Sequence, residues 1–163
     1  MKVKLQDVVE EMDVLHDQAA AYLNKRTGEL MTLTTEEFRA AERWEAEKEL
    51  EEVEDVLADY PEWQHELILK AKEIMESEDW LGLPSKFDIH EYAIMEEFCR
   101  SIADDELSYR LLSTIRGSGA FGRFRGAIEA LDLEQAWYDF RAGELEKIAV
   151  EWLEVNEIEY TSD

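Results

Sequence analysis

Cysteine is almost absent from this sequence of 163 residues, and long apolar runs are missing altogether. The single cysteine, Cys99, excludes an internal disulfide bond. No apolar run approaches the roughly 20 residues that a helix needs to cross a bilayer. The opening stretch, MKVKLQDVVEEMD, reaches a carboxylate before any signal-like apolar core appears. Together these absences predict a cytoplasmic protein.

Basic residues are also few, with 17 lysines and arginines against 41 acidic residues and a formal net charge of -24. Such a charge disfavours general binding to nucleic acid or to anionic lipid. Two interpretations stay open: a highly soluble acidic protein, or a mimic of the phosphate charge of a nucleic acid. The 45% hydrophobic and 10% aromatic content indicates a folded chain. The length suits one domain, residues 1–163, that buries roughly 70% of its unfolded surface.

The spacing of apolar residues predicts an α+β fold that is predominantly α-helical, with about six or seven helices and one small N-terminal β-hairpin. The hairpin pairs residues 19–23 with residues 30–33 across the turn-rich stretch 24–28. The helices are expected near residues 3–15, 34–58, 63–75, 92–102, 107–115, 120–131 and 134–155.

Start and stop signals support these helices. Thr34 and Glu37 form a capping-box pattern, Pro61 ends the second helix, and Asp88 with Glu91 is expected to cap the fourth. Asp104 or Asp105 is expected to cap the fifth helix. Apolar stripes are expected to include Trp63 and Met75 on the third helix, Tyr92 on the fourth, Phe121 on the sixth and Val155 on the last.

Three parts of the single domain follow from this pattern: a helix and hairpin in residues 1–34, an acidic helical segment in residues 35–80, and a helical core in residues 85–156. Residues 36–79 hold 17 acidic and 5 basic residues, a net charge of -12. One interpretation of these charges is a solvated helical face. In the alternative, a mimic of nucleic acid, the same segment would block a basic protein.

The most unusual stretch is the Gly/Arg loop, residues 116–125, with the sequence RGSGAFGRFR. From Leu107 to Ile128 there is no carboxylate, although the composition predicts about five or six, while four arginines fall there. Glycines allow close approach to a helix N-terminus, and arginines bind phosphate or carboxylate through charge-assisted hydrogen bonds. The candidate anion-binding residues are Arg116, Gly117, Ser118, Gly119, Arg123, Arg125 and Tyr138.

Helical geometry places Arg125 about 80° and Arg123 about 120° from the centre of the packed face of the sixth helix. Arg123 is therefore expected to face solvent and Arg125 to lie at the border of that face. The structural alternative is a tight helix–turn–helix whose arginines pair with the chain's own carboxylates. A Walker-type phosphate loop is disfavoured, because no Gly-Lys-Ser/Thr sequence follows and no strand precedes the glycines.

The sequence contains no recognisable metal-binding, cofactor-binding or catalytic motif. The three histidines show no zinc-ligand spacing, so no metal site, no cofactor and no catalytic residue are predicted. Cys99 falls among core residues, which predicts a buried and inert thiol. His90 and Glu97 are seven residues apart and could share one face of the fourth helix, as residues on the surface of a capped helix do.

Three stretches together resemble a bacterial family known as uncharacterised protein family 158. They are residues 22–29, residues 83–98, and residues 117–125 with Trp137-Tyr-Asp-Phe-Arg141 and Trp152-Leu153 after them. The glycine–alanine–phenylalanine stretch followed by the tryptophan–tyrosine pair is the most specific part. The resemblance implies a shared fold and supplies no activity, cofactor or site role.

We therefore expect a cytoplasmic, non-enzymatic binding or regulatory module whose Gly/Arg loop contacts an acidic protein partner or a small anion. One alternative is an enzyme or nucleotide-binding protein that acts on a phosphorylated substrate, with Arg116, Arg123 and Arg125 stabilising negative charge. The other is the acidic mimic of nucleic acid. These hypotheses differ in whether a small anion or a basic protein binds.

Overall fold

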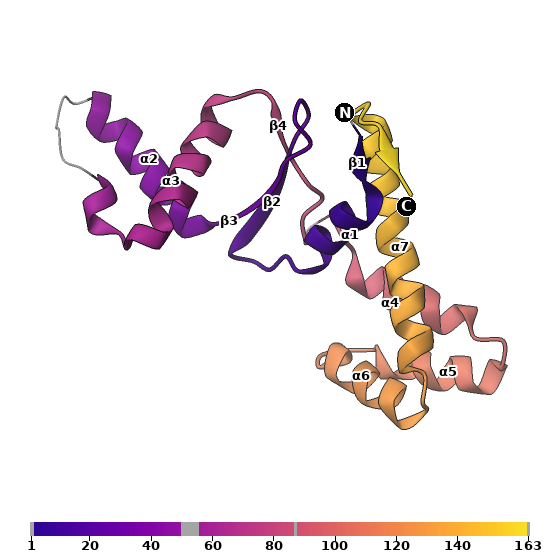
Figure 1. Ribbon diagram of the computed structural model, residues 1–163. Coiled ribbons are helices and arrows are strands. Elements are labelled where there is room, and N and C mark those ends of the chain that lie inside the picture. Colours follow the sequence, from indigo (N-terminus) through magenta and orange to yellow (C-terminus); the bar gives the residue numbers. More distant parts are fainter. Residues whose placement is uncertain (1, 50–55, 87, 163) are drawn as a thin grey trace.

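The computed structural model describes residues 2–49, 56–86 and 88–162. Within these ranges the chain forms seven α-helices, one short 3-10 helix and two small sheets, which confirms the predominantly helical α+β fold (Figure 1). No helix in the described ranges is long and apolar enough to span a membrane.

The N-terminal part contains the expected hairpin. After β1 (Val3–Lys4) and α1 (Leu5–Asp13), β2 (Ala19–Asn24) pairs antiparallel with β3 (Leu30–Thr34), with Leu23 opposite Leu30. The side chain of Asn24 accepts hydrogen bonds from the backbone N–H groups of Arg26 and Thr27 and so closes the turn. The predicted hairpin is confirmed.

Two strand pairings were not expected from the sequence. β4 (Trp80–Gly82) pairs antiparallel with the free edge of β2, and β5 (Tyr160–Thr161) pairs parallel with β1. These strands are two or three residues long, so none carries enough alternating residues for a period-two pattern. The second pairing brings the two ends of the chain together (Figure 1).

The acidic part forms a helical pair at one end of the molecule (Figure 1). It consists of α2 (Thr35–Glu49), the 3-10 helix η1 (Val56–Asp59) and α3 (Glu62–Glu76), with Pro61 at the N-cap of α3. The predicted break at proline is confirmed. Residues 50–55 of the second predicted helix lie outside the described residues, and its last residues belong to η1.

Two predictions in this helical pair are wrong. Thr34 directly precedes α2, but the side chains of Thr34 and Glu37 form no capping hydrogen bond among the described residues. Glu37 is 3% exposed, and its Oε2 has no hydrogen-bond partner there. Trp63 is 70% exposed and Met75 is also exposed, because Gln64, Ile68, Ala71 and Ile74 form the buried face of α3. The packed face thus keeps Ala71 and Ile74 of the apolar stripe, but in the first half of the helix Gln64 is buried in place of Trp63.

The second half of the chain builds the remaining helices: α4 (Glu91–Ser101), α5 (Asp105–Thr114), α6 (Ala120–Ala130) and α7 (Glu134–Val155). The carboxylate of Asp104 accepts a hydrogen bond from Leu107 N at 3.0 Å, which confirms that cap. Asp88 does not cap α4. Its carboxylate instead accepts hydrogen bonds from the backbone N and Oγ of Ser85, and His90 occupies the N-cap.

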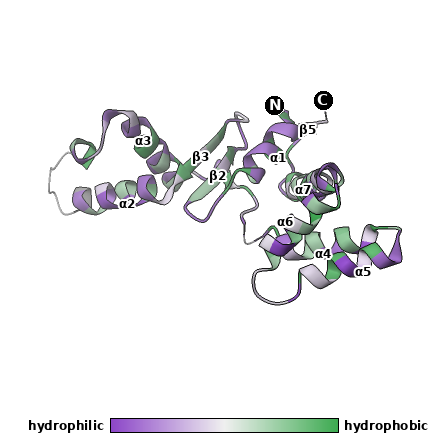
Figure 2. Ribbon diagram, turned by 90° about the horizontal axis from the view of Figure 1, so that it is seen from below, coloured by the Kyte–Doolittle hydropathy of each residue, from purple (hydrophilic) through white to green (hydrophobic). Residues whose placement is uncertain are grey.

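Aromatic packing joins α4, α6 and α7. The ring of Trp137 lies 4.9 Å from that of Phe124 and 5.4 Å from that of Phe98, centroid to centroid. Trp137 and Phe140 contact both the core around α4–α6 and the core around α1 and α7. Figure 2 shows hydrophobic ribbon segments in α4, α5 and α6, whereas α2 and α3 carry long hydrophilic stretches. This packing fixes the positions of α4, α6 and α7 around the site described next.

Candidate functional site

The Gly/Arg loop is a tight turn between α5 and α6. Gly117 and Gly119 have positive φ angles of 77° and 75°, which glycine adopts without steric cost. The guanidinium of Arg123 donates hydrogen bonds to the backbone carbonyls of Thr114, Arg116 and Ser118, with Nε 3.0 Å from the oxygen of Thr114. The turn is therefore closed around the side chain of Arg123.

This arrangement gives Arg123 a structural use. The last carbonyls of a helix lack partners within the helix and carry partial negative charge. A cation held against them satisfies their hydrogen-bonding capacity and interacts favourably with the helix dipole. The side chain of Arg123 is exposed to solvent, as expected, but its guanidinium is hydrogen-bonded to the end of α5.

The other arginines of the carboxylate-free stretch lie elsewhere. The guanidinium of Arg116 lies 6.0 Å from the ring centroid of Tyr109 on α5, a cation–π distance. Arg110 and Arg125 are exposed. Among the described residues, Arg110, Arg116, Arg123 and Arg125 form no ion pair with a carboxylate. The alternative in which these arginines pair with the chain's surplus acids is therefore not what the described structure shows.

A cavity of about 1130 Å³ opens on the opposite side of α6, between α4, α6 and α7. Arg125 and Tyr138 line it, and so does Gly122. Arg123 and Arg125 are two residues apart, so they project about 160° from each other around the helix axis. The structure thus divides the predicted site residues: Arg125 and Tyr138 lie at the cavity, and the other five lie at the turn.

The cavity combines an apolar lining with exposed aromatic rings. Its apolar residues include Ile89, Met95, Phe124, Ile128 and Trp137. Three further lining residues come from three different helices and are exposed: Tyr92 of α4 at 45%, Phe121 of α6 at 60% and Tyr138 of α7 at 63%. The prediction that Tyr92 and Phe121 are packed is wrong, because both side chains are exposed at the cavity and no neighbouring helix covers them among the described residues.

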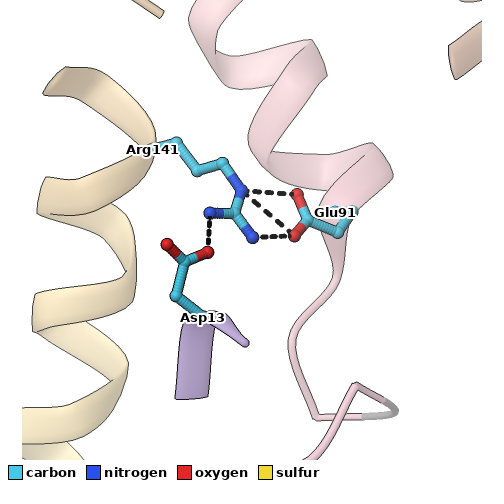
Figure 3. Close-up of polar contacts among 3 residues, drawn as sticks. All are labelled: Asp13, Glu91 and Arg141. Atoms are coloured by element: carbon cyan, nitrogen blue, oxygen red, sulfur yellow. Dashed lines mark hydrogen bonds and ion pairs between the residues drawn. The ribbon is translucent and has the colours of Figure 1, made fainter. Parts of the chain in front are cut away.

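Three charged residues that line the cavity, Asp13, Glu91 and Arg141, form a network of polar contacts (Figure 3). Arg141 of α7 donates from Nε to both carboxylate oxygens of Glu91, at 3.1 and 3.2 Å, and from Nη2 to Oε1 of the same residue. Its Nη1 donates to Asp13 at the end of α1. Hydrogen bonds to Glu91, and then to Asp13, raise the pKa of Arg141 above its ordinary value. The guanidinium therefore stays charged and ties α1, α4 and α7 together.

The sequence pointed to Arg141 only as part of a family-like stretch, with no role. Glu91 was predicted only as the partner of Asp88 in capping the fourth helix. In the structure it lies in the first turn of α4, where the helix dipole favours a carboxylate. The pairing itself joins residues 50 positions apart, and helical periodicity carries no information about such contacts.

Most charges around the cavity are already paired. Besides Arg141, Lys86 lies 3.0 Å from a carboxylate oxygen of Asp17. Arg125 forms no ion pair or hydrogen bond through its side chain within the described parts of the chain. Glu129 and Glu134, which also line the cavity, are exposed and form no ion pair there. Within the described part of the chain, the lining of the cavity thus includes one guanidinium and two carboxylates without an ion-pair partner.

The single thiol of the chain, Cys99, does not line this cavity. Cys99 is fully buried in α4, and burial raises the pKa of its thiol to about 11, which keeps it protonated at neutral pH. In the described ranges, His, Cys, Asp and Glu side chains form no cluster of three or more that could hold a metal ion.

The acidic segment neutralises part of its own charge. Arg43 contacts Glu47 at 3.0 Å and Asp59 at 2.7 Å, and Lys72 lies 3.3 Å from Glu45. Lys70 contacts Glu73 of α3 and Glu29 of the hairpin. These pairs link α2, η1, α3 and the hairpin. Several acidic residues that a nucleic-acid mimic could present to a basic partner are therefore engaged within the protein.

Residues 56–163 match the Uncharacterised protein family (UPF0158). The chain belongs to this family. The matched range contains α3–α7, and with them every residue of the cavity except Asp13. It includes the family-like stretches around residues 83–98 and 117–141, whereas residues 22–29 lie before it. No curated protein and no solved structure matches the chain.

Proposed function

We propose that this UPF0158 protein is a non-enzymatic binding or regulatory module of the cytoplasm. Its cavity between α4, α6 and α7 holds an anionic group of a partner against Arg125. Arg125 and Tyr138 contact the partner, while Arg123 and the glycines shape the turn that leads into α6.

The observation that supports this proposal most directly is that Arg125 is exposed at the cavity and forms no ion pair among the described residues. An exposed arginine in a chain of net charge -24 has no carboxylate partner among the described residues, and it lines a cavity beside two exposed aromatic rings. A guanidinium binds carboxylate or phosphate through two parallel hydrogen bonds. Phe121 and Tyr138 add exposed aromatic surface. Burying this surface under a partner stabilises the complex.

The experiment compares thermal unfolding in inorganic phosphate, sulfate, a nucleotide and a short acidic peptide, at constant ionic strength. A ligand that binds the native state raises Tm by mass action. We expect at least one of these anions to raise the Tm of the wild type, and Arg125→Ala to abolish the increase. Arg110→Ala is the matched control, because Arg110 is an exposed and unpaired arginine outside the cavity.

Calorimetric titration provides an independent reading of the same binding. If none of these anions binds the wild type below millimolar concentration, the proposal is wrong. Equal losses in Arg125→Ala and Arg110→Ala would also overturn it, because they would indicate a general charge effect.

A further inference from the structure

We infer that the partner enters the cavity as a short amphipathic helix of another protein, with an acidic side chain against Arg125 and a basic side chain near Glu129 and Glu134. This inference rests on the proposed function and specifies its ligand.

Two helices line the cavity with residues of the same helical spacing. From α7 come Glu134, Trp137, Tyr138 and Arg141, at positions i, i+3, i+4 and i+7. From α6 come Phe121, Phe124, Arg125 and Ile128, with the same spacing. Phe121, Arg125, Glu134 and Tyr138 are exposed there, whereas Phe124 and Ile128 are buried in the core. Each face rises about 10 Å along its helix, or about two turns. Such faces present ridges and grooves into which the ridges of a further helix pack.

The cavity is large enough for a peptide segment. Its volume of about 1130 Å³ lies near the upper end of the roughly 300–1,000 Å³ that is usual for small-molecule pockets. Its exposed aromatic residues come from three separate helices, so one ligand must extend between them to cover all three. A helix that lays its apolar face into a groove makes such contacts with anchors at i, i+3, i+4 and i+7.

The charged residues that line the cavity indicate which charged side chains the bound helix should carry. Arg125 and Glu129 are four residues apart on α6, so they follow each other along one side of that helix at about 6 Å. Glu134 adds a second carboxylate at the start of α7. An occupant with an acid and a base about one turn apart would pair with both signs. A segment with acids throughout would meet repulsion from Glu129 and Glu134.

The test is a selection of peptides against the immobilised full chain. The library displays random peptides of about 15 residues, long enough for four helical turns. We expect the enriched sequences to show apolar residues at i, i+3, i+4 and i+7 with a fixed acidic position. Selected peptides are then titrated against Tyr138→Ser, which should weaken binding about tenfold or more. Tyr109→Ser, an exposed tyrosine of α5 outside the cavity, should leave binding unchanged.

Charge reversal separates this inference from the proposed function. In Arg125→Glu the preferred acid should become a base, whereas Arg110→Glu should keep the original preference. If Arg125→Glu leaves the preference unchanged, the proposed function fails and the inference fails with it. If the preference follows Arg125 but the enriched peptides lack helical periodicity, only the helical occupant is wrong. Equal weakening by Tyr138→Ser and Tyr109→Ser would likewise overturn the helical occupant.

Discussion

Arg123 shows how one side chain can decide a local structure that glycine alone leaves open. Three carbonyls at the end of α5 and in the following turn accept hydrogen bonds from its guanidinium. Because a guanidinium presents five donors in a fixed plane, it can serve several carbonyls at once, whereas a lysine ammonium is a compact point charge. The identity of the residue therefore matters as well as its charge.

We predict that Arg123→Ala lowers the free energy of unfolding by about 1 kcal/mol, because carbonyls at a helix end lose a charged donor and only water replaces it. Arg123→Lys should recover less than half of the loss. Urea unfolding of both variants measures the effect, with Arg110→Ala as the control that removes an exposed arginine without a partner. An Arg123→Ala variant as stable as Arg110→Ala would contradict the capping role.

The glycines of the same stretch are not equivalent. Gly119 has a positive φ angle, and a Cβ there would lie 3.2 Å from Nη1 of Arg123, whereas a Cβ at Gly122 would meet open space. We predict that Gly119→Val destabilises the protein by at least about 1–2 kcal/mol. Gly122→Ala should stabilise α6 by about 0.5–1 kcal/mol. Thermal melts of the two variants test this, and equal or reversed shifts would refute the assigned roles.

At the scale of elements, Arg141 is the polar link between helices that are far apart in sequence. Its partners Glu91 and Asp13 lie at the start of α4 and at the end of α1. Asp13 occupies a helix C-terminus, where a carboxylate is unfavourable unless a cation compensates it. Arg141 supplies this cation (Figure 3) and also lines the cavity.

We predict that Arg141→Met destabilises the protein by about 1–3 kcal/mol, since it leaves two carboxylates without their donor. The double variant Arg141→Met with Glu91→Gln should lose less than the sum of the single variants. A double-mutant cycle from urea unfolding gives the coupling free energy. Additive losses within about 0.5 kcal/mol would mean that the pair contributes no net coupling.

Helix positions could be predicted from the sequence, either from apolar spacing alone, as for α7, or from a capping residue, as for α5. α7 spans the expected residues 134–155, and Asp104 caps α5 as expected. The face of α3 could not, because its stripe includes Trp63, a large apolar residue that the fold leaves exposed. Apolar spacing gives the period of a helix, but the neighbouring element decides which side of a mixed stripe is buried.

At the scale of the molecule, the sequence singled out residues of the candidate site but not their arrangement in space. The absence of carboxylates drew attention to Arg123 and Arg125, and Tyr138 was singled out because it lies off the apolar stripe of α7. Their division between a turn and a cavity depends on how α6 packs against α4 and α7. That packing is a tertiary property, set by Phe98, Phe124 and Trp137.

The net charge of -24 acts on the whole molecule. Many of its ion pairs are solvent-exposed, such as the one between Lys86 and Asp17, and exposed pairs contribute only about 0–1 kcal/mol each. Repulsion among 41 acidic residues is spread over the whole surface and is longer in range. At about 0.01 M salt the Debye length is about 30 Å, and at 0.15 M it is about 8 Å. Added salt therefore screens distant repulsions more strongly than close pairs.

We predict that raising NaCl from about 0.01 M to 0.15 M increases Tm, because the relief of repulsion exceeds the weakening of exposed ion pairs. Calorimetry of the wild type measures the change. Arg141→Met provides the comparison: its Tm should rise more steeply with salt, because Asp13 and Glu91 then add to the unscreened repulsion. A Tm that falls monotonically with NaCl would show that specific ion pairs, such as those of Arg141 and Arg43, outweigh the net charge.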